Sequence, residues 1–349
     1  MIFFKNDYSE GALPEVLEAL QKTNLESTVG YGLDPYCTGA ADKLRARFSC
    51  PEADVHFLTG GTLTNFTCIS AFLRPWEAVI APATAHIATH ETGAVEARGH
   101  KICTAETADG KLRPEQVRAI YAENQTWNVE HMVDPRLVYI SNPTELGTIY
   151  TKAELQALRQ VCDELNLLLY LDGARLAAAL TSRENDTVPA DYPALFDAFY
   201  VGGTKNGLLF GEALVITNDA LKPCFRHMIK QCGGMLAKGR LFGVQFGAWL
   251  EDDLWLRSAR HANEMAERLT AGIAEKGYDF LVDSPTNQLF PIFPDALVEA
   301  LSRDFAFEYQ AVLGDGRTAI RLVTSWATRP EAVSALLAAL PGQAERRSL

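Results

Sequence analysis

The sequence predicts an α/β protein with a mainly parallel central sheet sandwiched by helices, followed by a smaller C-terminal α+β domain. Segments of helical periodicity alternate with β-branched or aromatic runs over about the first 220 residues, a pattern typical of parallel strands covered on both faces. After about Gly239 the alternation stops, and a long helical stretch precedes short strand-like pieces. The 349 residues leave room for two domains of roughly 150 residues each. We expect a large domain over 1–240, including an N-terminal arm over 1–30, and a linking helix with a small domain over 241–349.

Within the first 240 residues, helices are expected where apolar side chains recur at helical spacing. The last of them begins at Thr151 with Glu154 three residues on, the spacing of a capping box. The expected helices are 14–23, 38–49, 62–73, 89–99, 113–124 and 151–166. The apolar runs between them predict strands over 54–61, 76–82, 136–143, 167–175, 197–206 and 211–217.

The last third of the chain has a different pattern. Residues 241–277 predict one long helix. Three strand-like pieces and a final helix follow, at 280–284, 288–293, 319–326 and 330–340. We find no internal repeat or low-complexity segment.

Charge and composition exclude several classes of partner. The net charge of −12 argues against nucleic acid or an anionic membrane surface, because both are bound by basic patches. No apolar stretch reaches the roughly 18 residues that span a bilayer, and the N-terminus does not resemble a secretory signal. The seven cysteines form no C-x-x-C pair, so we expect reduced thiols and a cytoplasmic protein.

Three predicted strands end in residues that suit a ligand site. In an open parallel sheet, ligands bind at the carboxyl ends of the strands. A loop that opens a helix offers free backbone N–H groups to a phosphate, although glycine turns before helices are also common. The three ends carry Gly60, Gly61 and Thr62; Asp172 and Arg175; and Thr204 and Lys205.

Asp172 and Lys205 follow apolar strands about one structural unit apart. A carboxylate at the end of a buried strand is costly unless it is paired, and the protonated ring nitrogen of pyridoxal 5'-phosphate (PLP) would pair it. A partly desolvated lysine has a lowered pKa and forms Schiff bases readily. Each residue alone also fits a structural role, as a helix cap or an exposed loop lysine. Together they favour a PLP site.

Two further residues have both a functional and a structural interpretation. Arg321 lies on a predicted strand, where it could bind a substrate carboxylate or form a structural salt bridge. His86 is followed by His90 and Glu91, a spacing that could suggest a metal pair. The order differs from that of zinc proteases, and we find no second ligand cluster, so we expect no metal.

Seven segments in order carry a resemblance to a known family: PEVLEAL (14–20), YGLDPY (31–36), LTGGTLTN (58–65), AHIATHETGA (85–94), LYLDGARL (169–176), VGGTKNG (201–207) and IRLVTSW (320–326). Their order and spacing resemble the threonine aldolase / aromatic amino acid β-eliminating lyase family of PLP enzymes. The resemblance runs from about Phe4 to Trp326 and implies the PLP-dependent transferase-like fold, fold type I.

The resemblance implies a role for each residue of the catalytic centre. Lys205 would form the internal aldimine, and Asp172 would pair with the pyridine nitrogen. His86 would stack on the cofactor ring. Arg175 would lie near the ring hydroxyl and the substrate carboxylate, which Arg321 would bind.

The resemblance also implies a wider set of contacts. Gly61, Thr62 and Thr204 would hold the cofactor phosphate. Active sites would form between subunits, so a homodimer or homotetramer is expected. Asn6 and Tyr31 match substrate-binding positions, and the supporting positions are Asp7, Asp34, Glu91, Lys238 and Arg240.

Three positions depart from the family pattern. Gly60 stands where the family usually has serine, which removes one hydroxyl from the phosphate loop. Thr144 replaces a family histidine associated with proton transfer. In CGGMLAKGR (232–240), Lys238 or Arg240 would substitute for the arginine that reaches the neighbouring subunit's phosphate. These changes leave the general base and the substrate open.

The main functional hypothesis is cleavage of a β-hydroxy-α-amino acid to glycine and an aldehyde through an external aldimine. Candidate substrates are L-threonine, L-allo-threonine and phenylserine, with His86 as the base for the β-hydroxyl. The alternative is β-elimination, which gives pyruvate and ammonia. A nucleotide-binding oxidoreductase, which lacks its glycine fingerprint here, and a non-catalytic PLP-binding protein are further hypotheses.

Overall fold

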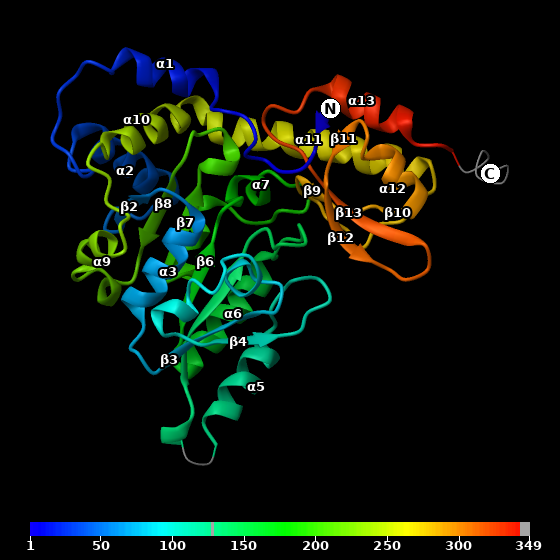
Figure 1. Cartoon of the computed structure of the whole chain (residues 1–349). Helices are drawn as coiled ribbons and strands as arrows, with labels where there is room; N and C mark the ends of the chain where they lie inside the picture. Colours follow the sequence, from blue (N-terminus) through cyan, green and yellow to red (C-terminus); the bar gives the residue numbers. More distant parts are fainter. Residues whose placement is uncertain (127–128, 343–349) are drawn as a thin grey trace.

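The protein contains a seven-stranded central sheet covered by helices on both faces (Figure 1). The computed structural model describes residues 1–126 and 129–342. All neighbouring strands are parallel except at β8, which is antiparallel to both of its neighbours. The predicted mainly parallel α/β sheet is therefore confirmed. The strand order is β2 (Asp54–Leu58), β8 (Glu212–Ile216), β7 (Ala198–Gly202), β6 (Leu168–Asp172), β5 (Asp134–Ser141), β3 (Glu77–Pro82) and β4 (Ile102–Ala105).

The strands are buried on both faces, as their continuous apolar runs predict. In β5, Val138 and Ile140 pack into one core, and Leu137 and Tyr139 pack into the other. Helices on the first side are α1 (Pro14–Lys22), α2 (Pro35–Phe48), α5 (Pro114–Asn124), α6 (Lys152–Leu165), α7 (Leu176–Leu180), α8 (Tyr192–Leu195) and α10 (Arg240–Trp249). Helices on the second side are α3 (Gly61–Phe72), α4 (His86–Thr89) and α9 (Phe225–Gln231).

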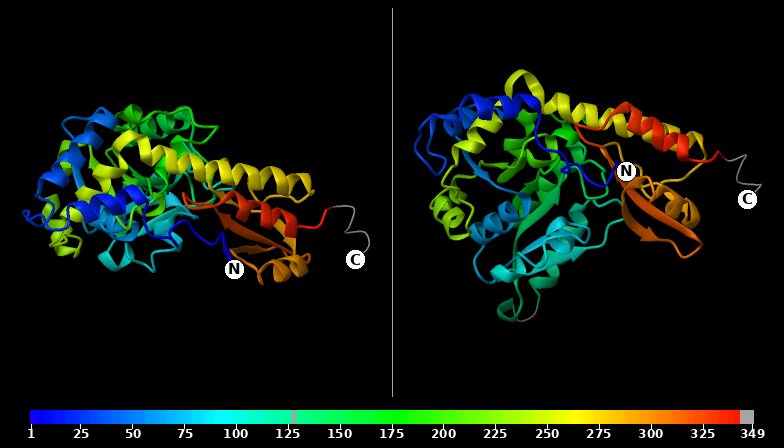
Figure 2. Two further views of the ribbon diagram at one scale, coloured as in Figure 1. Left: turned by 90° about the horizontal axis from the view of Figure 1, so that it is seen from above. Right: turned by 45° about the horizontal axis from the view of Figure 1, so that its top comes forward.

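The predicted smaller C-terminal domain is an antiparallel sheet packed against helices, with its own apolar core. The long helix α11 (Leu254–Glu275) runs from the large domain into it (Figures 1 and 2). Its other elements are β9 (Gln288–Leu289), β10 (Ile292–Pro294), α12 (Asp295–Leu301), β11 (Phe305–Ala306), β12 (Glu308–Val312), β13 (Arg317–Val323) and α13 (Pro330–Ala339).

The N-terminal arm connects the two parts of the molecule. Strand β1 (Ile2–Phe3) pairs with β11 of the small domain, and Phe4 is fully buried in that domain's core. The chain then crosses to α1 in the large domain (Figure 2). Residues just after β1 therefore pass between the two domains. A division at residue 240 stays a prediction.

Three predicted elements differ in the structure. The helix over 89–99 is wrong, because Thr92 and Gly93 have positive φ angles of 53° and 70°, which an α-helix does not accommodate. Residues 96–98 form only a 3₁₀ turn. The single helix over 241–277 is broken between α10 and α11, where Asp252 and Asp253 also have positive φ. The predicted strand over 280–284 is reduced to one bridge at Phe280.

Other details of the sequence analysis are confirmed. Thr151 and Glu154 form the capping box of α6, with the Thr151 N–H donating to Glu154 at 2.9 Å. All seven cysteines are free thiols. None of the helices in the described ranges is long and apolar enough to cross a membrane. The cytoplasm stays the predicted compartment.

Candidate active site

A cavity of about 310 Å³ opens at the carboxyl ends of β5, β6 and β7. This is the edge of the sheet at which a parallel α/β fold binds ligands. The sequence prediction placed seven residues around a cofactor, and the structure brings all seven to the wall of this cavity. They are Gly61, Thr62, His86, Asp172, Arg175, Thr204 and Lys205.

Asp172, the last residue of β6, is 4% exposed. Asn65 Nδ2 and the Ala174 N–H each lie 3.0 Å from one of its oxygens. Burial alone would raise the pKa of this carboxyl, but the charge of His86 and the donated hydrogen bonds hold it below its usual value. An ionised carboxylate thus faces the cavity. Its four donors are Asn65, Tyr139 and Tyr200 through their side chains and Ala174 through its backbone.

His86, at the start of α4, is held by a buried carboxylate. Its Nδ1 lies 2.8 Å from Glu91 Oε1, and the same oxygen accepts a hydrogen bond from Asn65 at 2.8 Å. When the ring is neutral, a carboxylate at Nδ1 favours the tautomer with its proton there, which leaves Nε2 as an acceptor. Asn65 therefore links Asp172 to the partner of His86. The backbone N–H of His86 donates to Glu145 at 3.0 Å.

Arg175 and Asp7 join the N-terminal arm to the sheet edge. Arg175 Nε and Nη2 lie 2.6 and 3.1 Å from the two oxygens of Asp7. Asn287 also donates to Asp7, at 3.0 Å. Burial opposes both charges, yet the ion pair lowers the pKa of Asp7 and raises that of Arg175. The neighbouring Asn6 uses its side-chain oxygen to accept from the Tyr8 N–H, and Tyr8 lines the cavity.

Lys205 lies in a 3₁₀ turn directly after β7. Burial and the positive charge of Arg175 lower the pKa of its amine, and Asp7, Asp172 and Glu212 act in the opposite direction. The turn is fixed on its far side by Asn206, which donates to the Trp255 carbonyl at 2.7 Å. The amine is therefore more readily deprotonated than an ordinary lysine.

Arg321 lies on β13 of the small domain and is not among the residues that line the cavity. Its Nε is buried and has no hydrogen-bond partner among the described residues. Its cross-strand neighbour Glu308 forms an ion pair with Lys5 instead, at 3.3 Å. Burial and the nearby Arg175 lower the pKa of Arg321. A partly buried guanidinium with an open donor is suited to an anionic ligand.

The sequence analysis did not identify several residues of this site. Asn65, Tyr139 and Tyr200 surround Asp172, and their positions inside a helix and two apolar strands gave no sign of that role. Glu145 accepts from Ser141 at 2.7 Å as well as from His86. Glu212 at the start of β8 also lines the cavity.

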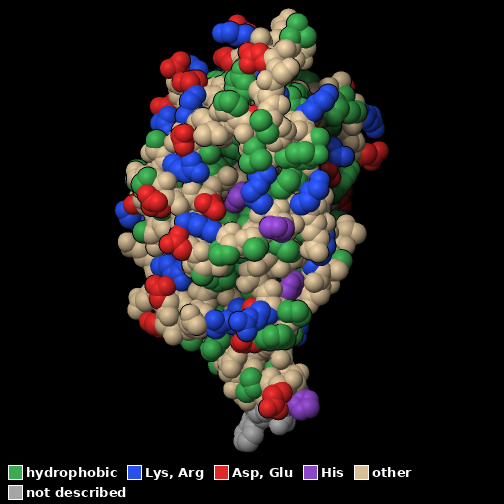
Figure 3. Space-filling model, turned by 90° about the vertical axis from the view of Figure 1, so that its left-hand side faces the viewer, with side chains coloured by type: hydrophobic (Ala, Val, Ile, Leu, Met, Phe, Trp, Pro, Cys, Tyr) green, Lys and Arg blue, Asp and Glu red, His purple; other side chains and the backbone are tan. Residues whose placement is uncertain are grey.

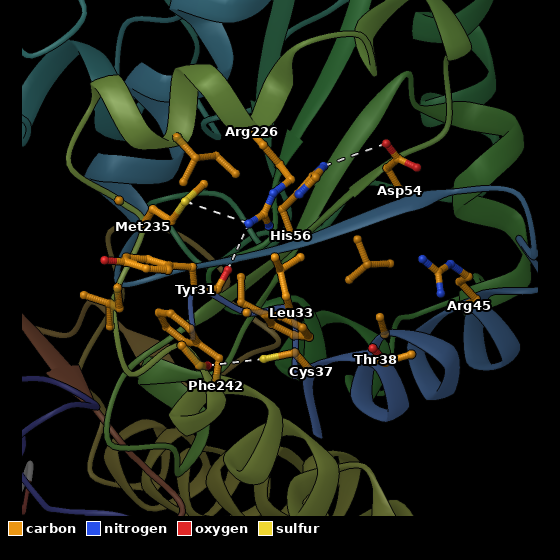
Figure 4. Close-up of a pocket in the computed structure, with 18 residues that line it drawn as sticks. Tyr31, Leu33, Cys37, Thr38, Arg45, Asp54, His56, Arg226, Met235 and Phe242 are labelled. Atoms are coloured by element: carbon orange, nitrogen blue, oxygen red, sulfur yellow. Dashed lines mark hydrogen bonds and ion pairs between the residues drawn. The ribbon is translucent and has the colours of Figure 1, made fainter. Parts of the chain in front are cut away.

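Four predicted site residues do not line this cavity: Tyr31, Asp34, Lys238 and Arg240. Figure 3 shows the side of the molecule that carries α2 and α9, where hydrophobic side chains are grouped with Lys and Arg. Tyr31 lines a second cavity of about 280 Å³ beside Met235 and Arg226 (Figure 4). Asp34 caps α2 by accepting from the Cys37 N–H at 2.9 Å. The remaining two are Lys238, which is exposed, and Arg240, which donates to the Thr23 carbonyl at 2.8 Å.

Comparisons with known proteins agree with this geometry. The family profile of beta-eliminating lyases matches residues 6–294. A low specificity L-threonine aldolase from Pseudomonas sp. is 33% identical over 338 residues, which are 96% of each chain. The solved threonine aldolase of Leishmania major is 47% identical, with a TM-score of 0.95 over 97% of this chain and 98% of that one.

More distant structures share the fold. The aspartate aminotransferase of Thermus thermophilus is 17% identical, with a TM-score of 0.72 over 97% of this chain and 90% of that one. At this identity the likeness concerns the fold alone, and it confirms the predicted fold type I. The chain belongs to the threonine aldolase and beta-eliminating lyase family, as the profile match over most of its length shows.

Proposed function

We propose that this protein is a PLP-dependent lyase that cleaves a β-hydroxy-α-amino acid, such as L-threonine, to glycine and an aldehyde. One observation carries the proposal: the buried carboxylate of Asp172, with its four hydrogen-bond donors, and the amine of Lys205 line one cavity, and Arg175 at the same cavity binds Asp7 of the N-terminal arm. The relatives named threonine aldolases support the choice of reaction.

The residues present fit PLP. The carboxylate of Asp172 is suited to a protonated ring nitrogen, and the amine of Lys205 is suited to an aldehyde. The first turn of α3 has no side-chain cap, so its N–H groups are open to a phosphate. At Gly61 a Cβ would lie 3.1 Å from the Tyr200 hydroxyl, which favours glycine there. When bound, PLP supplies an electron sink for the bond that breaks at Cα.

The chain's own residues position the substrate and move its proton. Arg321 binds the substrate carboxylate and so sets which bond at Cα is aligned for cleavage. With Nδ1 engaged by Glu91, Nε2 of His86 accepts the proton of the β-hydroxyl, directly or through a water. Loss of that proton drives cleavage between Cα and Cβ, which releases the aldehyde. Protonation at Cα then yields glycine.

A product assay tests the reaction. The enzyme is incubated with L-threonine or L-phenylserine, and glycine is measured together with acetaldehyde or benzaldehyde. The proposal predicts equal amounts of glycine and aldehyde. A 2-oxo acid and ammonia without glycine (2-oxobutyrate from threonine, phenylpyruvate from phenylserine) would contradict it and would favour β-elimination, the alternative that Thr144 left open.

Arg321 offers a test of substrate binding that spares the cofactor. We expect Arg321→Lys to raise the KM for L-threonine about ten- to a hundredfold, because a lysine cannot reproduce the two parallel hydrogen bonds of a guanidinium. PLP affinity should not change. The exposed Arg329→Lys is the matched control, and its KM should equal that of the wild type. An unchanged KM in Arg321→Lys would remove Arg321 from the carboxylate site.

We also propose a homodimer or homotetramer with shared active sites. The segment between α1 and α2 exposes large apolar side chains, which monomers rarely gather in one patch. They are Leu25 (94% exposed), Val29 (64%), Tyr31 (45%) and Leu33 (62%). In an assembly, Tyr31, Lys238 and Arg240 would face a partner's cavity. Light scattering should give the mass of two or four chains, and a monomer at assay concentration would contradict this proposal.

A further inference from the structure

Glu212 occupies the cavity edge because β8 runs against the rest of the sheet. It is the first residue of β8, and the register places it opposite Gly202 on one side and Leu58 on the other. Both partners are the last residues of their strands. Glu212 therefore lies between the turn that carries Lys205 and the Gly60–Thr62 loop. Its side chain lines the cavity and is 4% exposed.

A short chain of hydrogen bonds ends at this carboxyl. The Gly211 N–H donates to Thr204 Oγ1 at 3.0 Å, and Thr204 Oγ1 donates to Glu212 Oε1 at 2.8 Å. Because the Gly211 N–H can only donate, Thr204 Oγ1 accepts in the first bond, and its own hydroxyl proton is available for Glu212 Oε1. Thr204 therefore donates its single hydroxyl proton to Glu212. Glu212 Oε2 is buried and has no partner among the described residues.

An ion pair with Lys205 does not account for the free oxygen. No ion pair within 4.0 Å joins Lys205 to Glu212, although both residues belong to the part of the chain that the structure describes. A buried carboxyl without a close cation is more stable protonated than ionised. In that form a proton on Oε2 has no acceptor among the described residues, so a ligand could supply one.

We propose that Glu212 acts as a neutral carboxylic acid that donates a hydrogen bond from Oε2 to the phosphate of the bound cofactor. This inference rests on the proposed function and adds a phosphate contact to it. Glu212 would donate to the phosphate in place of the Thr204 hydroxyl, whose proton is donated to Glu212 Oε1. An ionised carboxylate at this position would repel a phosphate dianion, so only the protonated form is compatible with binding.

The electrostatic surroundings agree with a protonated Glu212. Burial raises the pKa of its carboxyl to about 8, and the hydrogen bond from Thr204 and the charge of Lys205 limit the rise. Asp172 on β6 raises it further. A bound phosphate would add to this effect. The other titratable groups around the cavity are Tyr8, His86, Glu145, Arg175 and Tyr200.

The sign of the pH effect follows from this chemistry. Below its pKa the carboxyl is protonated and donates, so the contact with the phosphate is present. As the pH rises through the pKa in the complex, the proton is lost and the contact becomes a repulsion. Affinity for PLP should therefore fall at alkaline pH because of Glu212, and affinity for pyridoxal, which lacks the phosphate, should not.

The test compares PLP with pyridoxal on the full-length enzyme freed of cofactor. Dissociation constants are measured from pH 6 to 10 for the wild type, E212A and E212Q. We expect E212A to weaken PLP about ten- to a hundredfold at neutral pH and to leave pyridoxal unchanged. E212Q keeps an N–H donor but has no proton to lose in this pH range. At neutral pH it should bind PLP as the wild type does, and at alkaline pH its affinity for PLP should fall less than that of the wild type. The ³¹P chemical shift of bound PLP should move in E212A.

The outcomes separate this inference from the proposed function. If PLP binds but E212A weakens PLP and pyridoxal equally, Glu212 acts through Lys205 or the fold, and the inference is overturned. The same holds if wild type and E212Q have identical pH profiles. If the wild type binds neither compound, the proposed function fails as well. Retained pyridoxal binding in E212A and E212Q shows that the variants are folded.

Discussion

Lys205→Ala is expected to lower kcat for L-threonine cleavage by at least about a thousandfold, the scale seen when a covalent nucleophile is removed from an enzyme. The amine of Lys205 lies in the same cavity as Asp172, and burial with the charge of Arg175 lowers its pKa. Alanine removes the only group that we assign to the cofactor aldehyde. The variant should also lose the visible absorption of lysine-linked PLP.

Glycine formation and the absorption spectrum measure this loss. Lys101, which is exposed, provides the matched control, and Lys101→Ala should behave as the wild type. Lys205→Arg retains the positive charge without a nucleophilic amine and should be as inactive as the alanine variant. Substantial activity in either Lys205 variant would show that another residue attaches the cofactor.

Asp172→Asn is expected to reduce kcat by roughly a hundred- to ten-thousandfold, the range given for catalytic proton and charge control. The substitution keeps the size of the side chain and removes the charge that pairs with a ring nitrogen. It also places an amide NH₂ among the donors Asn65, Tyr139 and Tyr200, which need an acceptor. The loss should appear in kcat and in PLP affinity.

The assay for Asp172→Asn measures glycine formation at saturating PLP, so that weaker cofactor binding does not hide the effect on kcat. Asp219, which has an 89% exposed side chain, serves as the control through Asp219→Asn. Thermal melting of each protein distinguishes a loss of catalysis from a loss of folding. A variant that melts as the wild type and turns over at the wild-type rate would contradict the role of Asp172.

Much of the fold could be predicted because its signals are local and repeated. Continuous apolar strands alternate with amphipathic helices, and each strand end carries its own polar residues. The edge of a parallel sheet then brings Asp172 and Lys205 to one cavity, as expected. The profile match to beta-eliminating lyases also removes the oxidoreductase hypothesis.

Other features depend on contacts that are not local. The antiparallel direction of β8 is invisible in its sequence, so Glu212 gave no sign of lying at the cavity. The segment 89–99 has helical periodicity, yet the positive φ angles of Thr92 and Gly93 prevent the predicted helix from forming. Strand β4 is only four residues long and depends on pairing with β3. Its apolar signal was too short to be predicted.

The site prediction had a comparable limit. A family resemblance places residues around an active site without stating which subunit supplies them. In the single chain Asp34 caps α2 and Arg240 binds the Thr23 carbonyl, so neither contacts the cavity from within the same chain. Asn65 could have been predicted as a site residue, because it is the last residue of the LTGGTLTN segment that also contains Gly61.

The most direct measurement for the central claim is reduction of the PLP-loaded enzyme with borohydride, followed by proteolysis and mass spectrometry. Reduction converts the lysine-linked cofactor into a stable pyridoxyl group. The account predicts one modified peptide per chain, with the group on Lys205 and a matching loss of activity. A pyridoxyl group on a different lysine, or no modification of an enzyme that binds PLP and cleaves threonine, would contradict it.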